Sequence, residues 1–263
     1  MDGIPENPTD AQLQAYAAYV QTMEDAKNYY LCHKREFPPQ WYDWQKELFN
    51  TYDKQVMLLA ANRVGKTWSA AYRVACDLTG QYPDDWDGFK QTHAPVALAM
   101  GIDNTQLKNV IQYELFGTVT ENKRFTGGWI HPDEILRIVW NNQVTGLVKE
   151  VTIKSKYGRS VIELRPYSVS KTGTGSLTIS GTNKDLIWVD ECPPDDIIGQ
   201  LITRTTMGNY GKGGRILYTL TPELGATQLV TQFLEDRKEG QKLIGPVSWD
   251  ECAHIPEERQ REL

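Results

Sequence analysis

Residues 60–67 have the composition of a loop that binds the phosphates of a nucleotide. The sequence Ala60-Ala-Asn-Arg-Val-Gly-Lys-Thr67 matches the pattern G-x-x-x-x-G-K-[ST] at every fixed position except the first, where Ala60 replaces glycine. In such a loop Gly65 lets the backbone approach the phosphates, Lys66 reaches the β- and γ-phosphates, and Thr67 can coordinate Mg²⁺. The residues predicted here to contact ATP are Ala61, Asn62, Arg63, Val64, Gly65, Lys66, Thr67 and Trp68.

Two adjacent carboxylates follow a second apolar segment, Leu186-Ile-Trp-Val-Asp190-Glu191. Asp190, at the end of a buried strand, can hold Mg²⁺ through water, and Glu191 can polarise the attacking water as a general base. An Asp-Glu pair that merely opens a surface loop is the alternative. The apolar strand and the upstream phosphate loop together favour an ATP hydrolase.

Three further polar residues are weaker candidates. Gln45, in Trp41-Tyr-Asp-Trp-Gln45, precedes the phosphate loop, and its amide can pair with N6 and N7 of adenine. Its alternative role is a polar position on an amphipathic helix. Thr219 and Thr221 end an apolar segment before Pro222, where a polar residue can sense the γ-phosphate and couple its loss to movement. A strand end followed by proline is the alternative, and the sequence leaves it open.

Hydrophobic periodicity places these residues at the ends of strands and helices. Short apolar segments predict buried strands, and apolar residues at helical spacing predict helices between them. The alternation indicates an α/β fold with a mainly parallel sheet flanked by helices. Helices are expected over 9–35, 41–52, 68–80, a segment capped by Asp103 or Asn104, and 230–238; strands over 55–61, 95–101, 185–190 and 215–221; a hairpin over 148–154 and 160–164; and a loop over 168–181.

Composition excludes several classes of protein. Hydrophobic residues make up 40% of the 263, which suffices for a core, yet no window reaches the roughly 18 apolar residues of a membrane span. The polar, acidic N-terminus is not a secretory signal. The four cysteines lie far apart and predict ordinary thiols. A net charge of −6 is the opposite of a protein that coats nucleic acid, so any DNA contact must be local.

The order of these motifs resembles the N-terminal ATPase half of the large subunit of tailed-bacteriophage terminases. The resemblance covers most of the chain and implies an ASCE-type (RecA-like) P-loop NTPase, with an extra strand between the two Walker strands. It implies an N-terminal helical extension (1–52), an ATPase core (53–228) and a partial lid (229–263). The segments that carry it are Trp44-Gln45, Leu58–Thr67, Leu78-Thr-Gly-Gln-Tyr-Pro83, Trp188-Val-Asp-Glu-Cys-Pro-Pro194, Leu201-Ile-Thr-Arg-Thr205 and Thr219-Leu-Thr-Pro222.

The resemblance also implies a function. Mg²⁺-dependent ATP hydrolysis would power the movement of double-stranded DNA into a procapsid, in the host cytoplasm and transiently at the portal vertex. The implied partners are DNA, the portal protein, the small terminase subunit and further copies of the chain in a pentameric ring, with a monomer in isolation as the alternative. No membrane is implied. Arg63 is expected to touch the γ-phosphate, and a neighbouring subunit to supply an Arg finger, with Arg204 as first candidate and Arg137, Arg159 and Arg165 as competitors.

Two alternatives and one departure accompany the resemblance. A helicase-like ASCE motor shares the motifs but needs a second RecA-like domain. A non-hydrolysing nucleotide-binding assembly protein is disfavoured by Glu191, since a protein that only binds needs no general base. Members of the family carry a C-terminal nuclease after the ATPase. The sequence ends at Leu263, and we expect no nuclease activity from this chain.

Overall fold

The computed structural model describes residues 9–20, 41–167, 182–221, 227–256 and 258. Their centre is an eight-stranded sheet with the order β3-β4-β5-β2-β6-β7-β1-β8. The strands are β1 (Gln55–Ala60), β2 (Val96–Gly101), β3 (Ile135–Trp140), β4 (Val148–Ser155), β5 (Gly158–Pro166), β6 (Leu186–Asp190), β7 (Arg215–Leu220) and β8 (Gln241–Val247).

The sheet is mainly parallel, as the sequence predicts. Strand β1 pairs in parallel with β7 and β8, β6 with β7 and β2, and β2 with β5; only β3-β4-β5 is antiparallel. Strand β7 lies between β1, which leads into the phosphate loop, and β6, which ends at Asp190. The expected extra strand between these two is therefore confirmed.

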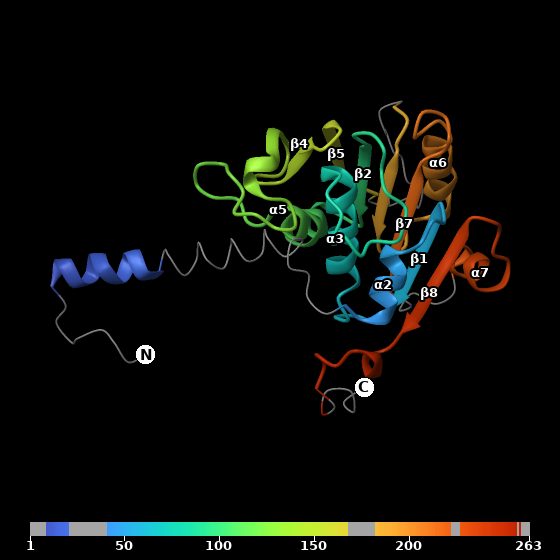
Figure 1. Cartoon of the computed structure of the whole chain (residues 1–263), viewed down its shortest axis with the longest axis horizontal. Helices are drawn as coiled ribbons and strands as arrows, with labels where there is room; N and C mark the ends of the chain where they lie inside the picture. The colour runs from blue at the N-terminus through green and yellow to red at the C-terminus, as the bar shows by residue number, and fades with distance from the viewer. Residues whose placement is uncertain (1–8, 21–40, 168–181, 222–226, 257, 259–263) are drawn as a thin grey trace.

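Helices cover both faces of the sheet (Figure 1). One face packs against α2, α3 and the segment α4–η1–α5, and the other against α6 and α7. Because successive strand residues point to opposite faces, Leu58 joins the first core and its neighbours Met57 and Leu59 join the second. The helices are α2 (Asp43–Phe49), α3 (Lys66–Thr79), α4 (Asn104–Gln106), η1 (Leu107–Gln112, a π-helix), α5 (Tyr113–Phe116), α6 (Asp195–Thr205) and α7 (Gln228–Glu235), with the short 3₁₀ turns η2 (Pro132–Glu134) and η4 (Trp249–Glu251).

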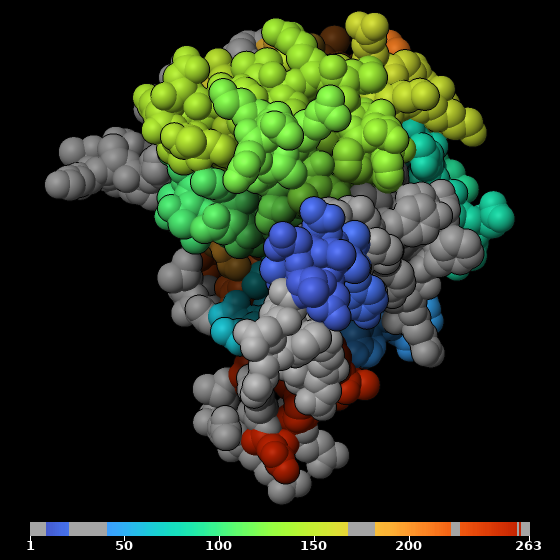
Figure 2. Space-filling view, turned by 90° about the vertical axis from the view of Figure 1, so that its left-hand side faces the viewer, coloured from blue at the N-terminus to red at the C-terminus, as the bar shows by residue number. Residues whose placement is uncertain are grey.

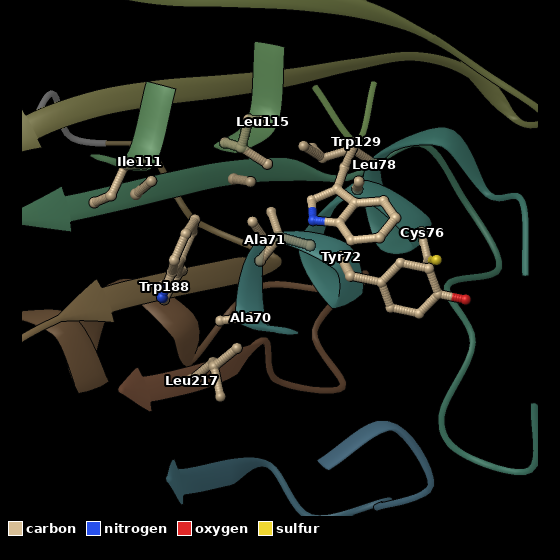
Figure 3. Packing of buried hydrophobic residues seen from close by; sticks show 14 of the residues in the cluster. Ala70, Ala71, Tyr72, Cys76, Leu78, Ile111, Leu115, Trp129, Trp188 and Leu217 are labelled. Atoms are coloured by element: carbon tan, nitrogen blue, oxygen red, sulfur yellow. The ribbon is translucent and has the colours of Figure 1, made fainter. Parts of the chain in front are cut away.

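Helix α3 is buried along nearly its whole length, which fixes the phosphate loop at its start. Ala70 and Ala71 pack with Trp188 and Leu217 of the sheet (Figure 3). On the outer side the rings of Tyr72 and Trp129 lie 4.9 Å apart, edge to face. The helix ends at Gly80, whose φ of 69° is the left-handed conformation of a common helix C-terminus.

Most of the predicted elements agree with the structure. The predicted hairpin is β4–β5, and the predicted strands are β1, β2, β6 and β7. Helix α2 is shorter than the predicted 41–52. Of the helix predicted over 9–35, residues 10–20 are helical; residues 21–35 and the predicted loop 168–181 lie outside the described residues.

Two strands were missed, and they lie at the edges of the sheet. Strand β3 falls in a segment of mixed character, and β8 falls in the predicted lid, where it pairs with β1. In Figure 2 the segment around β3–β5 forms the upper end of the molecule, and the residues after β8 form the lower end. None of the helices in the described part of the chain is long and apolar enough to cross a membrane.

The packing of α7 on the second core gives a stability prediction. Phe233 is fully buried against this face, whereas its neighbour Leu234 is 47% exposed. Phe233→Ala is expected to lower the free energy of unfolding by about 3–5 kcal/mol, because it removes buried apolar contacts and leaves a cavity. Leu234→Ala is the matched control and should cost less than about 1 kcal/mol. Urea denaturation measures both; equal costs would show that α7 does not pack as described.

Candidate active site

The phosphate loop joins the buried strand β1 to the buried helix α3. Gly65 has φ 97°, a conformation that glycine adopts without strain, and Arg63 has φ 65°, which is uncommon for a residue with a side chain. These two turns bring the chain to the N-terminus of a 14-residue helix, a favourable place for an anion. Ala60 lies within β1 and pairs with Val247 just after a register shift that follows Leu58, so the missing first glycine falls on strand backbone.

Lys66 lies inside the site with its charge already paired. Its side chain is 7% exposed, and Nζ lies 3.1 Å from Glu191 Oε1 and 3.4 Å from Asn62 Oδ1. A buried ammonium needs such partners, because losing water without them costs several kcal/mol. The structure therefore brings together three predicted residues from two separate motifs.

Asp190 is held by donors from three different elements. Its Oδ1 accepts from Thr67 Oγ1 at 3.1 Å and from Thr219 Oγ1 at 2.6 Å, and its Oδ2 accepts from Gln106 Nε2 at 3.0 Å. The residue is 1% exposed, and this burial raises the pKa of its carboxyl to about 6, against the hydrogen bond from Thr219. The backbone is fixed as well, since Tyr167 OH donates to the Asp190 carbonyl at 3.0 Å.

Glu191 adopts a strained backbone conformation beside this carboxylate. Its φ is 68°, and its N–H donates to Thr219 O at 2.8 Å. The side chain accepts from the N–H of Thr221 at 3.1 Å and from its hydroxyl at 3.0 Å. Non-glycine residues in this region cost about 1–3 kcal/mol and cluster at functional sites, so the geometry makes Glu191 a catalytic candidate.

A pocket of about 680 Å³ opens beside the phosphate loop. Its walls come from α2, the loop, α3, α5 and the segment after β8. The lining residues are Trp41, Tyr42, Gln45, Val64, Gly65, Trp68, Glu114, Ala253 and His254. Aromatic walls with a few polar groups are typical of sites for planar ligands.

Gln45 is buried at this pocket with both ends of its amide engaged. Its Oε1 accepts from Tyr42 N at 2.9 Å, and its Nε2 donates to Ser69 Oγ at 2.7 Å. An amide oxygen accepts two hydrogen bonds and an NH₂ donates two, so one of each remains for a ligand. The sequence did not predict that Gln45 also anchors the start of α3 through Ser69, which in turn donates to Gly65 O.

The segment after β8 fixes the phosphate loop from outside. Trp249 Nε1 donates to Asn62 O at 2.7 Å, and His254 Nε2 lies 3.2 Å from Arg63 O. Tyr42 OH lies 3.0 Å from His254 Nδ1, which is consistent with Nδ1 as acceptor and Nε2–H as donor to the loop. The N–H of Ala61 donates to Val247 O at 2.9 Å.

Three of the Arg-finger candidates, Arg204, Arg137 and Arg159, lie away from Asp190 within one chain, whereas Arg165 lies near the carboxyl end of β5, level with the end of β6. The Arg204 carbonyl accepts from Lys184 N, just before β6 begins, whereas Asp190 ends that strand. Arg137 belongs to β3 at the sheet edge, and Arg159 lies at the start of β5. Arg165 pairs with Glu163 at 3.1 Å.

Sequence reasoning missed Gln106, Trp249 and His254. Gln106 lies just beyond β2, the neighbour of β6, and polar residues outside the carboxyl ends of parallel strands are a general sign of a ligand site. That rule could have found it. Trp249 and His254 belong to a C-terminal segment without any motif, and only the pairing of β8 with β1 brings them to the loop.

Comparison with known proteins gives consistent matches. The family model described as "Terminase large subunit, T4likevirus-type, N-terminal" matches residues 57–262. The large terminase subunit of Salmonella phage P22 is 27% identical over 285 residues, covering 100% of this chain and 54% of that protein.

Solved structures share the fold. The large terminase of the thermophilic bacteriophage D6E in complex with ATP-gamma-S has a TM-score of 0.57 at 11% identity, covering 85% of this chain and 48% of its own. The same terminase in a second crystal form gives 0.58 at 11% identity, with coverages of 85% and 50%. The chain thus spans about half the length of the relatives it matches.

Thr219 supplies a testable link between the core and the site. Its hydroxyl accepts from Trp188 Nε1 at 3.0 Å and donates to Asp190. Thr219→Val keeps the volume but leaves the buried Trp188 N–H without this acceptor and removes one of the three side-chain donors to Asp190. At pH 8, without divalent cations, we expect the free energy of unfolding to fall by about 1–3 kcal/mol.

The pH dependence of this loss has a definite sign. Burial raises the native pKa of Asp190 to about 6, because the folded state disfavours the charged carboxylate. The carboxylate is therefore charged, and most in need of hydrogen-bond donors, only above that pH. Removing the Thr219 donor should therefore cost less at pH 5 than at pH 8 in urea denaturation. Thr203→Val, an exposed helical threonine, is the control. A loss that does not change with pH would contradict the predicted role of the Thr219–Asp190 bond.

Proposed function

This chain belongs to the terminase large-subunit family, and we propose that its site hydrolyses Mg²⁺-bound ATP to drive double-stranded viral DNA into a procapsid. The observation that carries the proposal is the arrangement of Lys66, Asp190 and Glu191 around the start of α3. Here Lys66 Nζ is 3.1 Å from Glu191, and Thr67 Oγ1 is 3.1 Å from Asp190. Two motifs far apart in the sequence thus meet in one site.

The phosphate end of ATP binds at the loop between β1 and α3. The backbone N–H groups and the dipole at the start of α3 attract phosphate oxygens, and Lys66 exchanges its contact with Glu191 for the β- and γ-phosphates. Arg63, exposed in the loop, binds the γ-phosphate. The D6E relative was solved with ATP-gamma-S, which supports the same ligand class here.

The base end of ATP binds in the pocket beside the loop. Its aromatic walls, Trp41, Tyr42 and Trp68, give the ring system faces to pack on. Gln45 uses its second acceptor site and second N–H for the N6 and N7 edge of adenine. Because Gln45 also bonds Ser69 of α3, base recognition and the phosphate loop share one side chain.

Hydrolysis needs a general base for the attacking water and a separate carboxylate for the cation. Thr67 and Asp190 present adjacent oxygens, the ligand type that Mg²⁺ prefers, so these residues fit the metal. When bound, Mg²⁺ neutralises charge on the phosphates. Glu191, oriented by both donors of Thr221, accepts a proton from the attacking water. The turn at Glu191 points the two carboxylates in different directions, Asp190 toward the cation and Glu191 toward the water.

Coupling to movement runs through the end of β7. Thr219 touches Asp190, and the Thr221 hydroxyl lies 3.2 Å from Asn62 and 3.0 Å from Glu191. The Thr221 hydroxyl has one proton and donates to only one acceptor at a time. Loss of the γ-phosphate therefore changes whether Thr221 donates to Asn62 or to Glu191. The 229–263 segment begins soon after this strand and is the element that would transmit the change.

The partners follow from the family and belong to the proposal. They are double-stranded DNA, the portal protein, the small terminase subunit and further copies of the chain in a pentameric ring at the portal vertex. With a net charge of −6, DNA contact depends on local basic groups rather than on the whole surface. No observation favours a helicase-like motor or a non-hydrolysing assembly protein.

The catalytic assignment is tested with two substitutions. Glu191→Gln should retain ATP binding while lowering kcat by about 10²–10⁴-fold, because the general base is lost but the phosphate site remains. Lys66→Ala should weaken ATP binding as well as turnover. Calorimetric titration of a non-hydrolysable ATP analogue and phosphate release measure the two effects, with Glu235→Gln, an exposed position of α7, as control. Turnover that survives in Glu191→Gln would mean that another residue is the base.

The trans Arg finger is tested by mixing inactive chains. Arg204 lies at the opposite end of β6 from Asp190, so we expect it to act on a neighbour's site. Arg204→Ala should lower the rate by about 10³–10⁵-fold in the assembled state only. Adding Glu191→Gln chains, which keep Arg204, should restore part of that activity. Arg237→Ala, at an exposed position, should have no effect. A rate per chain that is independent of concentration, and equal in Arg204→Ala, would rule Arg204 out.

A further inference from the structure

Gln106 is fixed at both ends of its side chain. Its Oε1 accepts from Ile102 N at 2.6 Å, and its Nε2 donates to Asp190 Oδ2 at 3.0 Å. Its own N–H donates to Asp103 Oδ1 at 2.8 Å, which caps the helical segment. A Cβ added at Gly101 would lie 2.7 Å from Gln106 Oε1, so the glycine leaves space for this amide. The side chain therefore has one defined direction.

The two oxygens of Asp190 are not equivalent. Oδ1 faces the hydroxyls of Thr67 and Thr219, on the side of the phosphate loop. For Oδ2, Gln106 is the hydrogen-bond donor among the described residues. Without it, the buried carboxylate would have an unpaired oxygen and could rotate about its χ2 bond. Gln106 thus fixes the plane of the Asp190 carboxylate, with one oxygen directed toward Thr67.

The segment α4–η1–α5, which carries Gln106, is anchored in the first core. The π-helix η1 follows directly, and π-helices are rare and frequent at functional sites. Leu107, Ile111 and Leu115 are fully buried in the first core and anchor the segment. Its other end supplies Glu114 to the base pocket. One anchored segment therefore touches the metal-side carboxylate and lines the pocket for the base.

We propose that Gln106 is a positioning residue that orients Asp190 for the divalent cation accompanying the nucleotide. This inference rests on the proposed function. An amide suits the role because it donates to a carboxylate without adding charge, whereas a second carboxylate would repel Asp190. Residues that orient a metal ligand through hydrogen bonds typically change metal affinity by about 10–100-fold when removed.

The test measures cation binding separately from turnover. Gln106→Met keeps the length and approximate volume of the side chain but removes the donor to Asp190 together with the acceptor of the Ile102 N–H. Free Mn²⁺ is titrated by its paramagnetic resonance signal against the chain with saturating ADP. We expect Gln106→Met to weaken Mn²⁺ binding about 10–100-fold, with ADP affinity in EDTA unchanged. The Mg²⁺ concentration for half-maximal ATPase rate should rise by a similar factor, while kcat at saturating Mg²⁺ changes much less.

Controls separate this role from a structural one. Asn109→Ala, an exposed position on η1, should leave Mn²⁺ binding as in the wild type. Thermal unfolding verifies that Gln106→Met is folded, and Gln106→Ala serves as a second variant. A folded variant that binds Mn²⁺ as tightly as the wild type overturns the inference alone. A wild-type chain that binds ADP but no Mn²⁺ overturns the inference and the metal site of the proposed function together.

Discussion

The site depends on directing two neighbouring carboxylates to different partners. Asp190 and Glu191 are consecutive, and a regular strand would simply alternate them across the sheet. Instead the backbone turns at Glu191, with φ 68°, directly after the strand ends. Asp190 then faces Thr67, and Glu191 faces Lys66. The turn thus separates the cation-side carboxylate from the carboxylate that can act as a base.

The order of strands supplies the donors that make this turn stable. Because β7 lies between β1 and β6, its end places Thr219 and Thr221 beside both carboxylates. Strand β2 lies on the other side of β6, and the residue just beyond it, Gln106, reaches the remaining oxygen of Asp190. If β1 and β6 were direct neighbours, these hydroxyls would have no place. The sheet order is therefore part of the chemistry of the site.

The sequence reveals those parts of the site whose signals are local. The strand–loop–helix around residues 60–67, the strand before Asp190 and the β4–β5 hairpin each follow from a few consecutive residues and were predicted correctly. Strand β8 was missed because its sequence, interrupted by Gly245 and Pro246, carries a weak apolar pattern, whereas the apolar run of β3 was overlooked among the loop signals of 117–150. Gln106 and His254 were missed for a different reason: their partners, Asp190 and Arg63, are brought near only by strand pairing. The predicted roles in ATP binding and coupling remain predictions.

The strained backbone of the site is stabilised by hydrogen bonds from several elements. Arg63 and Glu191 both have left-handed backbone, at about 1–3 kcal/mol each. The Arg63 turn is fixed by His254 at its carbonyl and by Trp249 at the preceding carbonyl, and the Glu191 turn by Thr221. Each of these hydrogen bonds contributes about 1 kcal/mol, so their total is comparable with the cost of the two left-handed conformations. The two strained turns flank Lys66, and the hydrogen bonds that hold them come from β7 and from the segment after β8. A ligand that moves Lys66 away from Glu191 therefore alters the balance between this strain and the hydrogen bonds from β7 and from the segment after β8.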